Sequence, residues 1–200
     1  MEGKNRKKTK GKSSVTKLII FLVKNIYEPK RISRLNILEK ELIINKEYSV
    51  ITNGTRKSAI SPFIHYAVGR KNGYVPDVVE VLNEYRYGYT ALISDGIIYQ
   101  LAEPEQIVSH ASGFNRSHLG IAFAYYGPVA KKVKGWIEKD GLWYPPYNDC
   151  DIEIAAQYLK MLYEKGFLES LEPIYHEDVN PKKRDVGPAF NRRWFECLLK

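Results

Sequence analysis

Apolar runs and turn signals predict four strands between residues 60 and 125. Residues 60–66 form an apolar run that contains His65, which predicts a buried strand. Residues 89–93 and 97–101 are apolar runs on either side of Asp95-Gly96, a sequence typical of a β-hairpin. Residues 119–125 are again apolar and predict another strand. The sequence therefore predicts a small sheet in the middle of the chain.

Apolar residues at helical spacing predict three helices, over residues 76–85, 151–164 and 190–199. Residues 127–149 are interrupted by glycine and proline and predict a long loop, and Asn53-Gly54 predicts a turn. The alternation of strands and helices gives the expected fold class, an α/β domain with a small mixed central β-sheet flanked by helices.

The first 55 residues differ in composition from the rest. Residues 1–14 are mostly Lys, Gly and Ser and predict a disordered basic tail. Residues 15–55 are interpreted as a partly helical N-terminal extension, with a helix over residues 15–27 and a helix or strand pair over residues 35–44. Residues 56–200 then form the main domain.

Positive charge is concentrated in this N-terminal arm. Residues 1–34 hold eleven basic and two acidic side chains, whereas the other 166 residues hold twenty basic and twenty-one acidic ones. The arm would favour anionic surfaces such as nucleic acid, acidic lipid or anionic wall polymers. A solubilising tail with no partner explains the same composition.

Membrane and disulfide signals are weak. The apolar run of residues 18–23 is shorter than the roughly 7–15 residues of a signal-peptide core and the roughly 20 of a spanning helix. We therefore expect no transmembrane segment and no evident signal peptide. Two cysteines far apart in sequence predict no disulfide framework.

A candidate metal site combines one upstream histidine with a short C-terminal stretch. His176, Lys183 and Asp185 fall within ten residues, and His65 ends the predicted buried strand. Two histidines, one carboxylate and an open fourth position form a ligand set of hydrolytic zinc sites. Each histidine alone is more often a hydrogen-bonded core residue, and residues 182–184 alone would be a solvated basic turn.

Four segments, in the same order along the chain, resemble the N-acetylmuramoyl-L-alanine amidase type 2 family, which includes phage lysozyme-type amidases and peptidoglycan recognition proteins. The sequence Pro-Phe-Ile-His-Tyr resembles its first ligand strand, and residues 88–101 resemble its central hairpin. Residues 109–121 resemble the stretch that crosses the active-site groove in phage members. Residues 176–190 resemble the C-terminal ligand motif.

This resemblance implies specific roles. It makes His65, His176 and Asp185 the zinc ligands, and it makes Lys183 and Tyr89 the catalytic residues. It implies that the phenol of Tyr89 faces the attacking water and that Lys183 stabilises the developing oxyanion. Without the resemblance, Tyr89 would be interpreted as a core aromatic residue.

Other positions carry weaker expectations. His110 and Asn115 are candidates for binding substrate, with a capped turn and a loop hydrogen bond as the alternatives. His118 is expected to be exposed. Cytosolic members of the family have a glutamate where this chain has Ala122, and the usual proline after the last ligand is Val186, so the site should follow the Tyr/Lys variant. Aromatic residues of the predicted loop could line a groove for sugars or cover the core; they are Trp136, Trp143, Tyr144 and Tyr147.

The resemblance implies a function as well. It predicts zinc-dependent hydrolysis of the amide bond between N-acetylmuramic acid and L-alanine in peptidoglycan, as in a phage endolysin. Residues 56–200 would be the zinc amidase domain, a monomer made in the cytoplasm without an evident signal peptide and acting at the bacterial cell wall. The expected partners are peptidoglycan and, through the arm, anionic wall polymers, with nucleic acid not expected. The alternative is a non-catalytic recognition module, although such members typically lose a ligand.

Overall fold

The computed structural model describes residues 41–69 and 73–200. The helix predicted over residues 15–27 and the basic tail lie outside the described residues. The compact unit that contains the sheet runs from Lys40 to Lys200. Strands β1 (Ile44–Asn45) and β2 (Thr52–Thr55), which come from the segment interpreted as an extension, both pair with strands of this unit.

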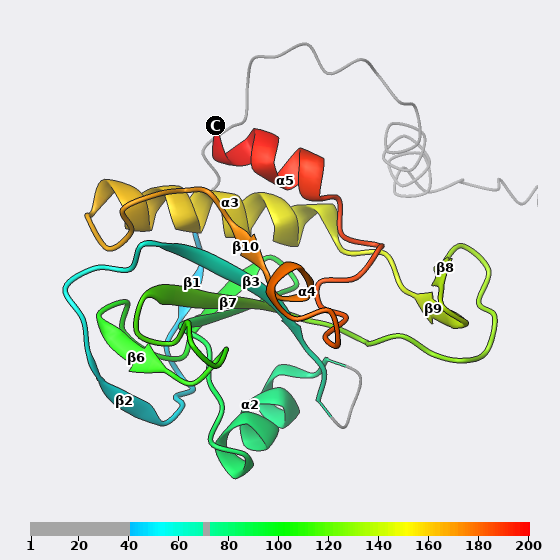
Figure 1. Ribbon diagram of the computed structural model, residues 1–200, viewed down its shortest axis with the longest axis horizontal. Coiled ribbons are helices and arrows are strands. Elements are labelled where there is room, and N and C mark those ends of the chain that lie inside the picture. Colours follow the sequence, from blue (N-terminus) through cyan, green and yellow to red (C-terminus); the bar gives the residue numbers. More distant parts are fainter. Residues whose placement is uncertain (1–40, 70–72) are drawn as a thin grey trace, which may run out of the picture. The chain divides into compact units, whose positions relative to one another are not determined.

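A six-stranded mixed sheet forms the centre of this unit (Figure 1), in the order β1-β5-β4-β7-β3-β10. Adjacent strands of this sheet are parallel, except for β4 and β5, which form an antiparallel hairpin. The remaining strands of the sheet are β3 (Ser61–Ala67), β4 (Ala91–Ser94), β5 (Ile97–Gln100), β7 (His118–Ala124) and β10 (Ile174–Tyr175). The predicted fold class and the strands predicted over residues 60–66 and 119–125 are confirmed.

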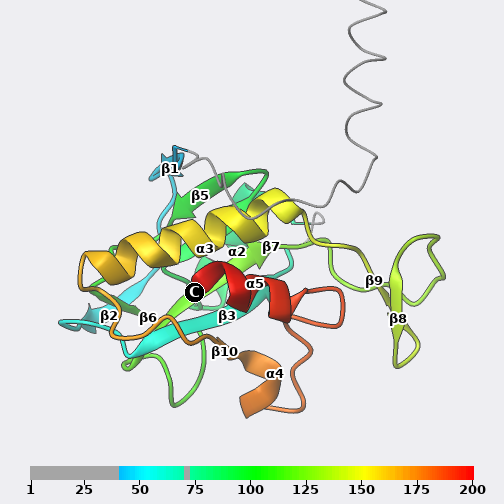
Figure 2. The ribbon, with the colours of Figure 1, turned by 90° about the horizontal axis from the view of Figure 1, so that it is seen from above.

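Helices cover both faces of the sheet (Figures 1 and 2). Helices α3 (Asp149–Glu164) and α5 (Arg192–Leu199) lie over one face, and α2 (Val75–Glu84) lies over the other. All three match the helices that the apolar spacing predicts. Each of α3 and α5 begins at an asparagine whose side chain accepts a hydrogen bond from the backbone of the first turn, which is a favourable N-cap.

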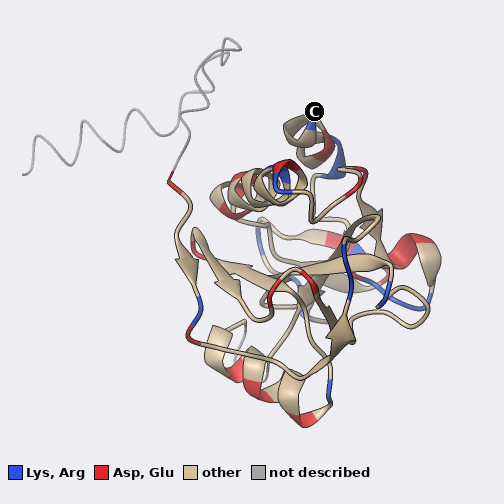
Figure 3. Cartoon of the chain, turned by 90° about the vertical axis from the view of Figure 1, so that its left-hand side faces the viewer, with Lys and Arg blue, Asp and Glu red and all other residues tan. Residues whose placement is uncertain are grey.

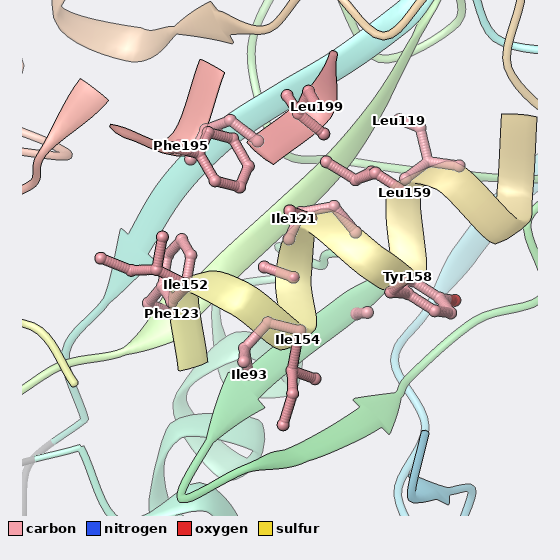
Figure 4. Close-up of a cluster of buried hydrophobic side chains, with 14 of the residues drawn as sticks. Ile93, Leu119, Ile121, Phe123, Ile152, Ile154, Tyr158, Leu159, Phe195 and Leu199 are labelled. Carbon is pink, nitrogen blue, oxygen red and sulfur yellow. The ribbon is translucent and has the colours of Figure 1, made fainter. Parts of the chain in front are cut away.

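The two faces carry separate apolar clusters because successive side chains of a strand point to opposite sides. On β7, Leu119, Ile121 and Phe123 pack against α3 and α5 (Figure 4), whereas Ala122 belongs to the cluster beneath α2. On β3, Ile64 packs toward α3, and the alternation puts His65 on the side of α2. Strand β3 thus packs into the core through Ile64 on one face and carries His65 on the other.

Two predictions about turns are wrong. Asn53-Gly54 lies inside β2, which pairs with β6 (Gln106–Val108) through an irregular register that replaces the expected turn. The predicted loop over residues 127–149 contains a hairpin of β8 (Ile137–Lys139) and β9 (Leu142–Tyr144). Its turn is Asp140-Gly141, both at positive φ, as in the predicted and confirmed Asp95-Gly96 hairpin.

Charged residues of both signs occur over the described unit (Figure 3), and their numbers nearly balance outside the arm. Among the described residues, no helix combines the length and apolar character needed to cross a membrane.

Candidate metal centre and its groove

Three elements bring the candidate ligands together. His65 lies on β3, His176 begins the short helix α4 (His176–Val179), and Asp185 lies between α4 and α5. Strand β10 pairs with β3 so that Tyr175 is opposite Ile64, which places the residues that follow them, His176 and His65, side by side. Parallel pairing at one strand end therefore joins residues 111 positions apart in sequence.

The ligand atoms are close enough to share one ion. Asp185 Oδ2 lies 2.9 Å from His65 Nδ1 and 3.0 Å from His176 Nδ1, and one donor atom from each residue lies within 4.8 Å of the others. Two nitrogens bound tetrahedrally to zinc at roughly 2.0–2.1 Å would be about 3.3 Å apart. The three donors therefore fit a small divalent cation.

Burial controls the protonation of this cluster. Burial lowers the pKa of His65, and the nearby Asp185 carboxylate only partly opposes this, so His65 is neutral at pH 7. Burial acts to raise the pKa of Asp185, but the hydrogen bond with His176 opposes that effect, and the pKa lies well below its ordinary value. The cluster thus presents a neutral imidazole and a carboxylate, the protonation states that bind metal.

His65 also contacts a second buried histidine. Its Nε2 lies 3.2 Å from His110 Nδ1, and His110 Nε2 lies 3.1 Å from the carbonyl oxygen of His118. Burial, followed by the proximity of His65, lowers the pKa of His110 to about 3, so this ring is neutral too. A carbonyl only accepts, so His110 donates from Nε2 and accepts at Nδ1, which makes His65 donate from Nε2.

The series of contacts from Asp185 through His65 and His110 to the His118 carbonyl has fewer protons than contacts, and this favours a bound cation. Asp185, His65, His110 and the His118 carbonyl are separated by three short contacts, and two neutral imidazoles supply only two protons. The lone pair of His65 Nδ1 therefore faces the Asp185 carboxylate at 2.9 Å. A cation between them would turn this repulsion into attraction, so the residues fit a metal ion on electrostatic grounds as well as by distance.

The position of His110 depends on a glycine. A Cβ on Gly120, in β7, would lie 2.6 Å from Cγ of His110, so the ring can reach His65 only because that position has no side chain. Asn115 Oδ1 accepts hydrogen bonds from the backbone N–H groups of His110 and Ala111, and Arg56 donates to the carbonyl oxygens of Asn115 and His118. These bonds fix the loop that carries His110.

His118 is buried, so its expected exposure is wrong. Its ring lies edge-on to Phe63 and Phe114, and its Nδ1 is 2.8 Å from Ser117 Oγ. The strand register explains this: His118 is the first residue of β7, opposite Ser61 of β3, and the sequence pattern did not extend the strand that far. The carbonyl of His118, rather than its side chain, contacts His110.

An open pocket of about 670 Å³ adjoins the cluster. His176, Asp185 and His110 line it, together with the predicted catalytic residues Tyr89 and Lys183. The ring of Tyr89 lies 5.0 Å from that of His65, and burial, followed by the charge of Asp185, raises the pKa of Tyr89, which keeps the phenol protonated. A protonated phenol can donate a hydrogen bond toward the pocket.

The structure brings most of the predicted site residues to this one pocket. Asn115 also lines it, while Ala122 lies opposite His65 in the pairing of β7 with β3, so no acid occupies that position. The aromatic residues of the β8–β9 region do not line this pocket, and Tyr147 stacks on Tyr125 in the interior. The contact between His110 and His65 is a feature that the sequence interpretation missed.

Comparisons with known proteins identify the fold. No protein-family model matches the sequence, and a search of curated proteins found no match. The endolysin N-acetylmuramoyl-L-alanine amidase LysCS from Clostridium intestinale is similar in structure, with a TM-score of 0.55, 18% identity, and coverage of 78% of this chain and 94% of that one.

Peptidoglycan recognition proteins have the same architecture. Drosophila PGRP-SA matches with a TM-score of 0.53 and 18% identity over 74% of this chain and 88% of its own. Peptidoglycan recognition protein-LE, solved in complex with tracheal cytotoxin, a monomeric diaminopimelic acid-type peptidoglycan, gives a TM-score of 0.52 and 16% identity over 78% and 91%. The chain therefore has the fold shared by N-acetylmuramoyl-L-alanine amidases of type 2 and peptidoglycan recognition proteins, with a His/His/Asp group at its candidate metal centre.

Proposed function

We propose that the protein is a zinc-dependent N-acetylmuramoyl-L-alanine amidase that hydrolyses the amide bond between muramic acid and L-alanine in peptidoglycan. The observation that carries the proposal is the convergence of His65, His176 and Asp185 on one point, where His176 and Asp185 line an open pocket. The fold similarity to an amidase endolysin supports the same reaction class.

Zinc held by His65, His176 and Asp185 would supply Lewis acidity, lowering the pKa of a bound water to about 7 and polarising the amide carbonyl. His110 keeps His65 in the tautomer whose Nδ1 lone pair faces Asp185. Lys183 brings a positive charge to the pocket, where it stabilises the oxyanion that develops on the carbonyl oxygen. Tyr89 orients the attacking water by a hydrogen bond from its protonated phenol.

Purified peptidoglycan is the direct substrate for a test. The full chain with zinc should release new L-alanine amino groups without new reducing ends, because an amide and no glycosidic bond is cleaved. Chelation should abolish this release, zinc should restore it, and His65→Ala should remain inactive with zinc present. Full activity of the chelated protein would contradict the proposal.

A non-catalytic recognition module is the second candidate, and the fold similarity to peptidoglycan recognition proteins favours it. This candidate predicts that the chain sediments with peptidoglycan but releases no amino groups at any zinc concentration. The two functions are therefore separated by one assay of binding and one of amino-group release on the same preparation.

The proposed site of action is the bacterial cell wall, where this reaction would serve either a phage endolysin or a bacterial remodelling amidase. Residues 1–34 carry the basic arm, for which we propose attraction to anionic wall polymers. Deleting residues 1–34 should then weaken lysis of whole cell walls at low salt more than at high salt. Unchanged lysis at both salt concentrations would contradict this role of the arm.

A further inference from the structure

The pocket beside the metal centre has an excess of positive charge. Four of its lining side chains are cationic, namely Arg86, Lys182, Lys183 and Arg184, whereas Asp185 is the sole carboxylate among its described lining residues. That carboxylate already lies within 3.0 Å of two histidine nitrogens. The remainder of the pocket therefore presents positive charge that Asp185 does not balance.

Among the residues that the structure describes, these four cations form no ion pair. Within residues 41–69 and 73–200, the ion pairs of arginine and lysine involve other basic side chains. Apart from Asp185, the acids nearest in sequence to the 182–184 segment are Glu177 and Asp178, and both pair with Arg192. All four cations of the pocket are exposed and so available to a ligand.

Arg86 lies at a backbone position where glycine is the usual residue. It follows the end of α2 with φ of 56°, and the bonds from Arg86 N to Asn83 O and from Tyr87 N to Leu82 O form a Schellman-type helix end. The left-handed residue of this motif is usually glycine, because a side chain there is strained. The local fold therefore does not explain an arginine at this position.

We propose that the pocket recognises a free carboxylate on the peptide stem of the muramoyl peptide, with Arg86 and Arg184 as the groups that bind it. The inference rests on the proposed function, which supplies the muramoyl peptide as ligand. The second residue of such a stem, a glutamate, carries either a free α-carboxylate or the corresponding amide. A guanidinium binds a carboxylate through paired, charge-assisted hydrogen bonds and gains far less from a neutral amide.

Two matched ligands test this recognition. N-acetylmuramoyl-L-alanyl-D-glutamate and N-acetylmuramoyl-L-alanyl-D-isoglutamine differ only by a carboxylate in place of a carboxamide. In calorimetric titrations of the zinc-loaded full chain with Tyr89→Phe, which retains all four cations and slows ligand consumption, the free acid should bind about 10-fold more tightly. The preference should shrink at high salt.

Equal affinities for the two ligands would overturn the inference. In parallel, the protein without substitutions is assayed for hydrolysis of both compounds and of peptidoglycan. Hydrolysis without a preference would contradict only the carboxylate recognition, whereas neither binding nor hydrolysis of any of the three would contradict the proposed function and this inference with it.

Substitutions distinguish a specific role of Arg86 and Arg184 from a general effect of positive charge. Arg86→Gly suits the left-handed backbone, so it should fold at least as well while the preference for the free acid falls roughly 3- to 10-fold. Arg184→Gln should reduce the preference similarly. Arg193→Gln, an exposed arginine on α5 outside the pocket, is the matched control and should leave the preference intact. A preference unchanged in both Arg86→Gly and Arg184→Gln would overturn the assignment.

Discussion

Nε2 of His65 lies 3.2 Å from Nδ1 of His110, and this contact sets the tautomer of His65. Because His110 donates its other N–H to a carbonyl, it can only accept from His65. His65 is thereby left with a lone pair at Nδ1, on the side of Asp185 and His176. A second histidine, which does not belong to the His/His/Asp group, thus prepares one of the three proposed ligands for a cation.

Replacing His110 should weaken metal binding without removing a ligand. In His110→Ala, His65 loses the acceptor that fixes its tautomer and ring orientation, and the affinity for zinc should fall about 10- to 100-fold. Competition with a chromogenic chelator measures this change. Ser112→Ala, which alters a different lining residue of the same pocket, is the control and should keep the original affinity. An unchanged affinity in His110→Ala would contradict the role of the contact.

Gly120→Ala should displace the imidazole ring of His110. Its Cβ would lie 2.6 Å from Cγ and 2.9 Å from Cβ of His110, so the loop must move. The expected cost is roughly 1–3 kcal/mol of unfolding free energy, together with weaker zinc binding. Urea unfolding and the chelator competition measure the two effects. A variant with normal stability and normal zinc affinity would show that this close packing is not required.

The metal-free protein should lose stability as the pH falls below 7. Burial lowers the pKa of His110 from 6.5 to about 3, so between these values the unfolded chain binds a proton that the folded chain excludes. Stability therefore rises with pH in this window, and His110 alone contributes a loss of about 2 kcal/mol between pH 7 and pH 5.

Urea unfolding of the metal-free chain at both pH values measures this slope, and His110→Gln should flatten it. An equal slope in the variant would mean that other groups, and not His110, carry the pH dependence.

Lys183→Met and Tyr89→Phe should separate catalysis from metal binding. Neither side chain belongs to the His/His/Asp group, so both variants should bind zinc normally. Loss of oxyanion stabilisation or of water orientation should each lower kcat by about 100-fold or more. Amino-group release and zinc content are measured together. Lys165→Met, at the exposed end of α3, is the control for loss of a lysine. Full activity of either site variant would contradict its assigned role.

The sequence predicts the elements whose apolar residues follow a clear period. Strand β3, the Asp95-Gly96 hairpin and helix α3 are all predicted because their apolar positions and turn residues agree. The hairpin of β8 and β9 is missed because its strands are short and β8 is exposed, so an apolar run flanks Asp140-Gly141 on one side only, over residues 142–144. The Asn53-Gly54 signal fails because pairing with β6 overrides the local turn preference.

The candidate site is only partly readable from the sequence. His176, Lys183 and Asp185 are recognisable because they are close along the chain, and His65 because it follows an apolar run. The contact of His110 with His65 depends on the room left by Gly120 and on loop bonds made by Asn115 and Arg56. Such contacts arise from tertiary packing and leave no periodic signal in the sequence.

The shared cation is tested most directly by the metal content of the purified full chain after zinc loading and dialysis, measured by mass spectrometry beside His65→Ala and Asp185→Asn. The protein without substitutions should hold about one zinc ion per chain and both variants should lose most of it, with folding checked by circular dichroism. Absence of bound zinc in the unsubstituted chain, or full zinc content in both folded variants, would contradict the claim that these side chains share a single cation.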